Sequence, residues 1–258
     1  MDPSRDELGR ALAFMARVDE GVATEVRGWS LGTALITPEL PKVWDSSYFR
    51  VEGSDAGDGE SVAEETARVA AVAGLAHATV VVTEGAVATR LRPGLLSAGF
   101  EETRFVLMAL RSVPPKPEIR IESASFADVA PSRRELTLET FHGDEALADQ
   151  LAELDRRLEA TIGGRWFAIS DGGRIVSRAW LLAARGVGQV EDVATSASHR
   201  GRGLARATVS AAARASHRSG NDPTFVVTNS GETTPRLYRK TGFEPLGFKW
   251  RFLKPLGT

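Results

Sequence analysis

Residues 200–203, with the sequence Arg-Gly-Arg-Gly, constrain the fold of this chain more than any other feature. They lie between residues 189–195, which are predicted to form a strand, and residues 204–219, an alanine-rich run predicted to form a helix that ends at Gly220. Glycine lets the backbone approach a ligand closely, and the first N–H groups of a helix point outward with the positive end of the helix dipole behind them. The sequence therefore predicts a strand–turn–helix unit whose turn can hold an anion.

Two common phosphate-binding motifs do not fit this turn. A dinucleotide-binding fingerprint requires a third glycine where the chain has Arg206. A P-loop ends in Gly-Lys-Ser or Gly-Lys-Thr, and residues 189–220 contain no lysine. His199, beside the turn, is interpreted as a solvated residue rather than a catalyst. An ordinary turn with glycines used only for tight packing stays open as an alternative.

The spacing within the turn matches a known ligand-binding pattern. Arg200, Gly203 and Ala205 give Arg-x-x-Gly-x-Ala, which resembles the acyl-CoA signature of the GNAT N-acetyltransferases. The resemblance implies acetyl-CoA as the co-substrate, lying along the preceding strand, and no metal. The residues that it assigns to acetyl-CoA are Val193, Ala194 and Thr195 for the pantetheine arm, Arg200, Gly201, Arg202, Gly203, Leu204, Ala205 and Arg206 for the pyrophosphate, and Asn229 for the end of the arm.

A second segment also resembles this family. Residues 224–228 are predicted to form a strand, and Pro235 can begin a helix because proline is tolerated at the first helical position. Tyr238 follows on that helix, and a Gly-Phe pair comes at 242–243, as in the family's second signature. The family places this phenol beside the thioester sulfur, whereas Leu237 and the phenylalanine of the pair are interpreted as core residues.

Acetyl transfer to an amine needs a base, a donor for the oxyanion and an acid for the leaving thiolate. Tyr238 is the predicted acid, because a phenol with a pKa near about 10 can protonate a thiolate. The backbone N–H of Val193 is the predicted oxyanion donor. Glu191 is the predicted base, since alternation along a strand places it on the face of Val193 and Thr195 and directs Asp192 to the opposite face. A surface ion pair is an equally open interpretation of Glu191.

A proline-rich stretch at 112–117 predicts a linker, because three prolines in four positions favour an extended chain. A faint copy of the C-terminal pattern precedes it. Residues 80–84 resemble 225–229, and Gly-Phe-Glu occurs both at 99–101 and at 242–244. This similarity indicates a duplication.

The first copy lacks the chemistry of the second. Leu95 takes the place of Tyr238, and residues 53–60 form an acidic, glycine-rich loop where the second copy has its arginine turn. Carboxylates repel a pyrophosphate, although solvated turn residues are the simpler interpretation of this loop. We therefore predict two domains, a degenerate GNAT-like domain at 1–113 without the acyl-CoA motif and a catalytic GNAT domain at 118–258.

The predicted fold class is α/β in the α+β sense, with two GNAT-like domains, each a mixed and mostly antiparallel sheet flanked by helices. In the C-terminal half, a strand is predicted at 119–123, and helices at 127–141 and 145–160. A hairpin joins strands 166–170 and 174–184 through an Asp-Gly-Gly turn.

Composition limits the classes of function. The net charge of −2 and the lack of a basic tail argue against nucleic acid as a partner. The absence of cysteine excludes disulfides, thiolate zinc sites and a cysteine nucleophile, and the four histidines are scattered. No apolar run approaches the about 20 residues of a membrane span, and the acidic N-terminus is unlike a signal peptide. We expect a cytoplasmic protein without membrane contact, and its arginine and alanine usage indicates a GC-rich bacterial genome.

The leading hypothesis is an acyl-CoA-dependent N-acyltransferase that moves acetyl from acetyl-CoA to a primary amine of a small molecule or peptide by direct attack. The alternative is a non-catalytic acyl-CoA-binding or regulatory module. Residues such as Trp166, Trp180 and Glu191 would line the acceptor pocket, although most tryptophans are expected in the core. The sequence does not identify the amine, and a homodimer stays open.

Overall fold

The computed structural model describes residues 3–53, 57–231 and 234–256. The chain forms two compact units. The cradle unit, which contains the arginine turn, consists of Met1–Met15, Leu107–Thr228 and Glu232–Gly247. The companion unit consists of Ala16–Val106, Asn229–Gly231 and Phe248–Thr258. Four elements supply residues to both units, namely α1 (Pro3–Val22), β5 (Glu101–Leu110), β10 (Thr224–Asn229) and β11 (Phe243–Pro255).

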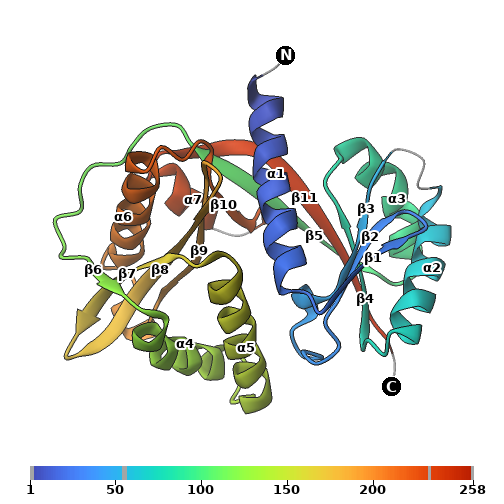
Figure 1. Cartoon of the computed structure of the whole chain (residues 1–258), viewed down its shortest axis with the longest axis horizontal. Helices are drawn as coiled ribbons and strands as arrows, with labels where there is room; N and C mark the ends of the chain where they lie inside the picture. Colours follow the sequence, from blue (N-terminus) through green and yellow to red (C-terminus); the bar gives the residue numbers. More distant parts are fainter. Residues whose placement is uncertain (1–2, 54–56, 232–233, 257–258) are drawn as a thin grey trace. The chain divides into compact units, whose positions relative to one another are not determined.

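The cradle unit is built on strands in the order β5-β10-β9-β8-β7-β6 (Figure 1). Its further elements are β6 (Glu122–Ala124), α4 (Phe126–Thr140), α5 (Glu145–Ile162), β7 (Arg165–Asp171), β8 (Arg174–Ala184), β9 (Val187–Thr195), α6 (Leu204–Arg218), β10 (Thr224–Asn229) and α7 (Thr234–Arg239). β8 pairs antiparallel with β7 and β9, whereas β9 is parallel to β10. The predicted mixed, mostly antiparallel sheet with flanking helices is confirmed.

Local sequence explains where these elements begin and turn. Ser125 and Asp128 form a reciprocal capping box at the start of α4, which satisfies backbone donors that a helix leaves unpaired. Gly172 and Gly173, with φ values of 56° and 79°, form the predicted turn between β7 and β8. Of the predicted elements, β6 is the least accurate, since the strand covers 122–124 instead of 119–123.

Small residues bring α6 close to the sheet. A Cβ on Gly188 of β9 would lie 2.2 Å from the Ser216 hydroxyl of α6. That hydroxyl is 2.7 Å from the Thr224 hydroxyl of β10, so the buried polar groups satisfy each other. α6 therefore covers the face of the sheet that carries Gly188, and α4 and α5 contact β8.

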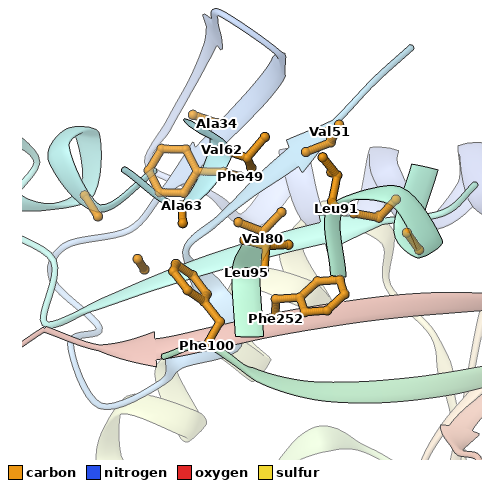
Figure 2. Packing of buried hydrophobic residues seen from close by; sticks show 14 of the residues in the cluster. Ala34, Phe49, Val51, Val62, Ala63, Val80, Leu91, Leu95, Phe100 and Phe252 are labelled. Atoms are coloured by element: carbon orange, nitrogen blue, oxygen red, sulfur yellow. The ribbon is translucent and has the colours of Figure 1, made fainter. Parts of the chain in front are cut away.

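The companion unit has strands in the order β1-β2-β3-β4-β11-β5 (Figure 1). Its elements include β1 (Glu25–Trp29), β2 (Gly32–Ile36), β3 (Tyr48–Val51), α2 (Gly59–Val72), β4 (His77–Val82) and α3 (Gly85–Ser97). β3 and β4 are parallel, and the pairs β1–β2, β2–β3 and β4–β11 are antiparallel. Figure 2 shows Phe49, Val80, Leu95, Phe100 and Phe252 packed together in its core.

Both copies of the Gly-Phe pair have the same local conformation. Gly99 and Gly242 have φ values of 85° and 88°, and the phenylalanines that follow them, Phe100 and Phe243, are buried. Phe243 is thus a core residue as expected, whereas Leu237 is only half-buried. The domain boundaries at 113 and 118 stay a prediction.

The acidic loop at 53–60 belongs partly to helix α2. Asp58 accepts a hydrogen bond from the Ser61 N–H at 2.8 Å and so caps this helix. A Cβ on Gly59 would lie 2.0 Å from the Leu91 carbonyl oxygen of α3. Residues 54–56 of the predicted loop lie outside the described residues.

Two further features concern the part of the chain that the structure describes. None of its helices combines the length and the apolar character needed to cross a bilayer. It also contains no group of three or more histidine, cysteine or acidic side chains placed to hold a metal ion.

Candidate functional site

β9 and β10 run side by side only at their first residues. The parallel pairing joins Thr224 to Gly188 and Phe225 to Gln189. Both strands are fully described, and they continue without a further pair between them. They therefore open toward their carboxyl ends, and the backbone edge of β9 beyond Gln189 is not covered by β10.

The arginine turn follows directly after this opening. Gly201 and Gly203 have left-handed φ values of 77° and 78°, a conformation that favours glycine. A Cβ on Gly201 would have no neighbour within 4 Å, so the turn has open space beside its backbone. Gly203 is the N-cap of α6 and no side chain caps this end. The first N–H groups of α6 therefore lack the intrahelical partners that later ones have.

The arginines of the turn are exposed and are held near it by backbone acceptors. Arg200 donates from Nε to the Thr195 carbonyl at 3.2 Å, and Arg202 donates from Nη2 to the Ser198 carbonyl at 3.1 Å. Arg206 is exposed on the first turn of α6. The turn thus combines backbone donors with three cationic side chains, a combination that suits a phosphate group.

His199 differs from its interpretation as a solvated residue. Its Nε2 lies 3.0 Å from Asp171 Oδ2, and its Nδ1 lies 3.0 Å from the Ser196 hydroxyl and 2.9 Å from that of Ser198. The side chain is 19% exposed. The ring ties the turn to the β7–β8 hairpin, because Asp171 is the last residue of β7.

Tyr238 and Glu191 are close enough to influence each other electrostatically. Tyr238 of α7 is 5% exposed, and its ring meets Phe243 edge-on with centroids 6.1 Å apart. Burial raises the pKa of the Tyr238 phenol, and the negative charge of Glu191 raises it further. The phenol is therefore protonated at neutral pH. Glu191 is half-buried and also accepts a hydrogen bond from the Gln189 amide.

A bulge interrupts β9 next to Glu191. Trp180 of β8 pairs with Glu191, and Arg178 pairs with Ala194. Two residues of β9, 192 and 193, therefore lie opposite the single residue between Trp180 and Arg178. Regular alternation of side chains ends at this point.

The bulge overturns two expectations about faces. Directly paired residues share a face, and Trp180 and Arg178 are two positions apart, so Glu191 shares its face with Ala194 and not with Thr195. Asp192, with φ of 44°, was expected on the opposite face. Its carboxylate instead accepts from Arg178 Nε at 2.6 Å, on the Glu191 side of the sheet. The expected alternation of side chains along β9 does not hold, because it assumes regular pairing with β8 and no bulge.

Four charged side chains form a covered network around the bulge. Arg133 of α4 donates to both Asp155 of α5 and Asp192, with its Nη2 2.7 Å from Asp155 Oδ1. Arg178 binds Asp192 and donates to the Ser132 hydroxyl at 3.3 Å. Arg178 is 4% exposed and Asp155 is 1% exposed. Burial by itself lowers the pKa of Arg133, but the charges of Asp192 and Asp155 raise it overall.

No sequence pattern predicts this network. Its members come from α4, α5, β8 and β9, and no local spacing relates them. One signal was present, because Arg178 lies within the otherwise apolar run 178–183, and a charged side chain in a buried strand requires a partner. The sequence does not indicate which acidic residue is that partner.

The remaining predicted site residues divide between the two units. Trp166 and Trp180 are buried and stack with centroids 4.5 Å apart, as core residues. Asn229 belongs to the companion unit, and its Oδ1 accepts from the Gly231 N–H at 3.0 Å. The other predicted residues, 191, 193–195, 200–206 and 238, all lie in the cradle unit.

Comparisons with known proteins agree with this geometry. Residues 169–252 match the family model described as FR47-like protein. A GCN5-related N-acetyltransferase from Kribbella flavida aligns with a TM-score of 0.62 and 19% identity over 96% of both chains. The chain is a GNAT-fold protein.

Two other solved structures align with this chain at low identity. A functionally unknown conserved protein from Staphylococcus epidermidis aligns with a TM-score of 0.61 and 11% identity, over 90% of this chain and 94% of that one. A GCN5-related N-acetyltransferase from Sphaerobacter thermophilus has a TM-score of 0.52 and 21% identity, over 71% of this chain and 62% of its own. A comparison with curated proteins gives no match. The segment that matches the FR47-like model contains the bulge, the arginine turn and Tyr238 of this GNAT-fold protein.

Proposed function

We propose that this chain is an acyl-CoA-dependent N-acyltransferase that transfers acetyl from acetyl-CoA to a primary amine of a small molecule or peptide. One observation carries the proposal. The opening between β9 and β10 leads directly to the glycine turn at the start of α6. An uncovered strand edge can pair with an extended chain, and a helix N-terminus favours a phosphate.

The proposed binding mode uses the two features together. The backbone of Val193, Ala194 and Thr195 pairs with the pantetheine arm, and the N–H groups of residues 202–206 receive the pyrophosphate. Arg200 adds a charge-assisted hydrogen bond. Gly201, which has a left-handed φ and open space beside its backbone, supports this assignment, because a side chain in that space would obstruct the ligand.

The proposed reaction is direct attack of the neutral amine on the thioester carbonyl. The N–C bond forms, the C–S bond breaks, and the amine proton passes to Glu191 or through water. The Val193 N–H stabilises the oxyanion, and the leaving thiolate takes the phenolic proton of Tyr238. Burial and the charge of Glu191 raise the pKa of this phenol, so the proposed acid is protonated at the start of each turnover.

Calorimetric titration of acetyl-CoA into three proteins tests the binding mode. The wild type is expected to bind in the micromolar range, and Gly203→Glu is expected to lose binding because a carboxylate repels the pyrophosphate. Gly220→Glu is the matched control, since Gly220 follows the other end of α6, has φ of 74° and has no neighbour within 4 Å of its Cβ position. Equal loss in both variants, or no binding to the wild type, would remove the main support for the proposal.

Turnover separates an enzyme from a non-catalytic acyl-CoA-binding or regulatory module. The chain contains no cysteine, so a thiol reagent reports only the coenzyme A that is released. We expect release in the presence of at least one member of a library of amino acids, polyamines, aminoglycosides and peptides. Binding without release from any of them would favour the module.

We also propose that the companion unit holds no acyl-CoA. The start of its helix α2 is occupied by the Asp58 carboxylate and lies against the α3 backbone at Gly59. Leu95, in the place of Tyr238, is a fully buried core residue without a proton to give. Titration of the Gly203→Glu variant tests this too, since a second site would leave residual binding.

A further inference from the structure

Asp192 has a left-handed backbone conformation, which is uncommon for residues other than glycine. Its φ of 44° lies in the left-handed region, which costs free energy for residues that carry a Cβ. Such strain persists only where the surrounding structure holds it, and it is concentrated at functional sites. Asp192 is also the residue at which β9 departs from regular pairing with β8.

The network around the bulge supplies the force that holds Asp192. Its carboxylate binds Arg178 Nε at 2.6 Å and also accepts from Arg133. Arg133 is fixed in turn by Asp155, which is 1% exposed. The two positive and two negative charges balance, so each ion of the network, including the buried Asp155 and Arg178, has a partner.

We propose that Asp192 is a positioning residue, held by Arg133 and Arg178, that keeps the β9 bulge in its left-handed form. The bulge sets the direction of the backbone at Val193 and Ala194, on the edge that β10 leaves uncovered. The network thereby couples helices α4 and α5 to the strand that holds the acyl donor. This inference rests on the proposed function for its link to acetyl-CoA.

Two substitutions of one residue separate conformation from charge. Asp192→Gly and Asp192→Ala both remove the carboxylate and leave the two arginines without this partner, so their melting temperatures should fall by similar amounts. Glycine adopts the left-handed conformation freely, whereas alanine does not. We expect acetyl-CoA affinity within about threefold of wild type for Asp192→Gly, and a loss of about tenfold for Asp192→Ala.

Hydrogen exchange of the amides at 191–195 gives a readout that does not depend on acetyl-CoA. We expect faster exchange in Asp192→Ala than in Asp192→Gly, because only alanine pulls the bulge toward regular strand geometry. Arg178→Ala should resemble Asp192→Ala. Arg174→Ala is the matched control, since Arg174 also lies on β8 and pairs with Glu135 of α4 at 2.6 Å, but at an exposed position.

The outcomes distinguish this inference from the proposed function. Equal affinity and equal exchange in the glycine and alanine variants would overturn the positioning role, whether both are impaired or both are normal. An effect of Arg174→Ala as large as that of Arg178→Ala would also overturn it. If the wild type fails to bind acetyl-CoA, the proposed function falls, and the exchange difference between the two variants still decides whether Asp192 holds the bulge.

Discussion

Tyr238 is the residue whose loss should affect chemistry and spare binding. Tyr238→Phe keeps the ring that packs on Phe243 and removes only the phenolic hydroxyl group. We expect kcat to fall by about 10²- to 10⁴-fold, the usual contribution of a general acid, with acetyl-CoA affinity within about twofold of wild type. Coenzyme A release and calorimetry measure the two quantities. Unchanged kcat would contradict the acid role.

The raised pKa of Tyr238 also predicts a pH dependence. A phenol with an ordinary pKa near about 10 would begin to ionise as the pH approaches that value, and the acid form would be lost. Burial and the charge of Glu191 raise the pKa of Tyr238, so the acid form persists to higher pH. We expect kcat to show no decline between about pH 8 and pH 10. A fall over this interval that is absent in Tyr238→Phe would show an ordinary phenol instead.

Residue by residue, the sequence predicts a candidate site only where its signal is local. The turn at 200–205 and Tyr238 are predicted site residues because their motifs fit within a few consecutive residues. The partners of Asp192 could not be found in this way, since Arg133 and Arg178 come from different elements and meet only in the folded chain. The location of an ion pair depends on packing, and packing is not encoded in one short segment.

At the scale of elements, the two Gly-Phe pairs show why the chain has glycine at these positions. Gly242 and Gly99 both have left-handed φ values, but their surroundings differ. A Cβ on Gly242 would lie 2.0 Å from the Ser112 carbonyl oxygen, whereas the nearest atom to a Cβ on Gly99 is Lys254 Cε at 3.8 Å. The two glycines thus form a natural pair for comparing strain alone with strain plus a backbone clash.

We expect Gly99→Ala to lower the free energy of unfolding by about 1 to 2 kcal/mol, the cost of a left-handed residue with a Cβ. Gly242→Ala should cost about 3 kcal/mol or more, because the Ser112 backbone must also move. Urea denaturation followed by circular dichroism measures both values. Equal losses would mean that the chain relaxes around Gly242 without penalty.

Most elements could be predicted, and their irregularities could not. Glycine, proline and capping residues mark the ends of α4, α6 and the β7–β8 hairpin, and the sequence contains these marks. The bulge at Asp192 has no such mark, because Glu191-Asp192-Val193 is compatible with a regular strand. Tertiary ion pairs favour the bulge there, so local preference gave the wrong faces for Glu191 and Asp192.

For the whole molecule, the two compact units do not correspond to two consecutive parts of the sequence. The proline-rich stretch predicts a boundary there, but the cradle unit includes residues 107–110 of β5 and the companion unit includes 248–255 of β11. A sequence repeat shows that two halves are similar, and it does not show which half completes which sheet. That depends on strand pairing between residues far apart in the chain.

Because the companion unit includes residues 248–255 of β11, an N-terminal fragment of the chain should not fold normally. A fragment of residues 1–113 lacks β11, whose residues 250–255 pair with 77–82 of β4. It also lacks Phe252, which is 0% exposed in the core of the companion unit. Without this strand β4 becomes an uncovered apolar edge, which favours aggregation. We expect the fragment to be insoluble or to unfold without a cooperative transition.

A synthetic peptide of residues 243–256 should restore a soluble, cooperatively unfolding fragment by completing the sheet. The same peptide with Phe252→Asp should fail, because a carboxylate in that position would be buried without a partner. Circular dichroism and sedimentation of the fragment, with and without each peptide, test both expectations. Cooperative folding of residues 1–113 alone would instead support the boundary that the linker predicts, and β11 would then be a dispensable addition to that domain.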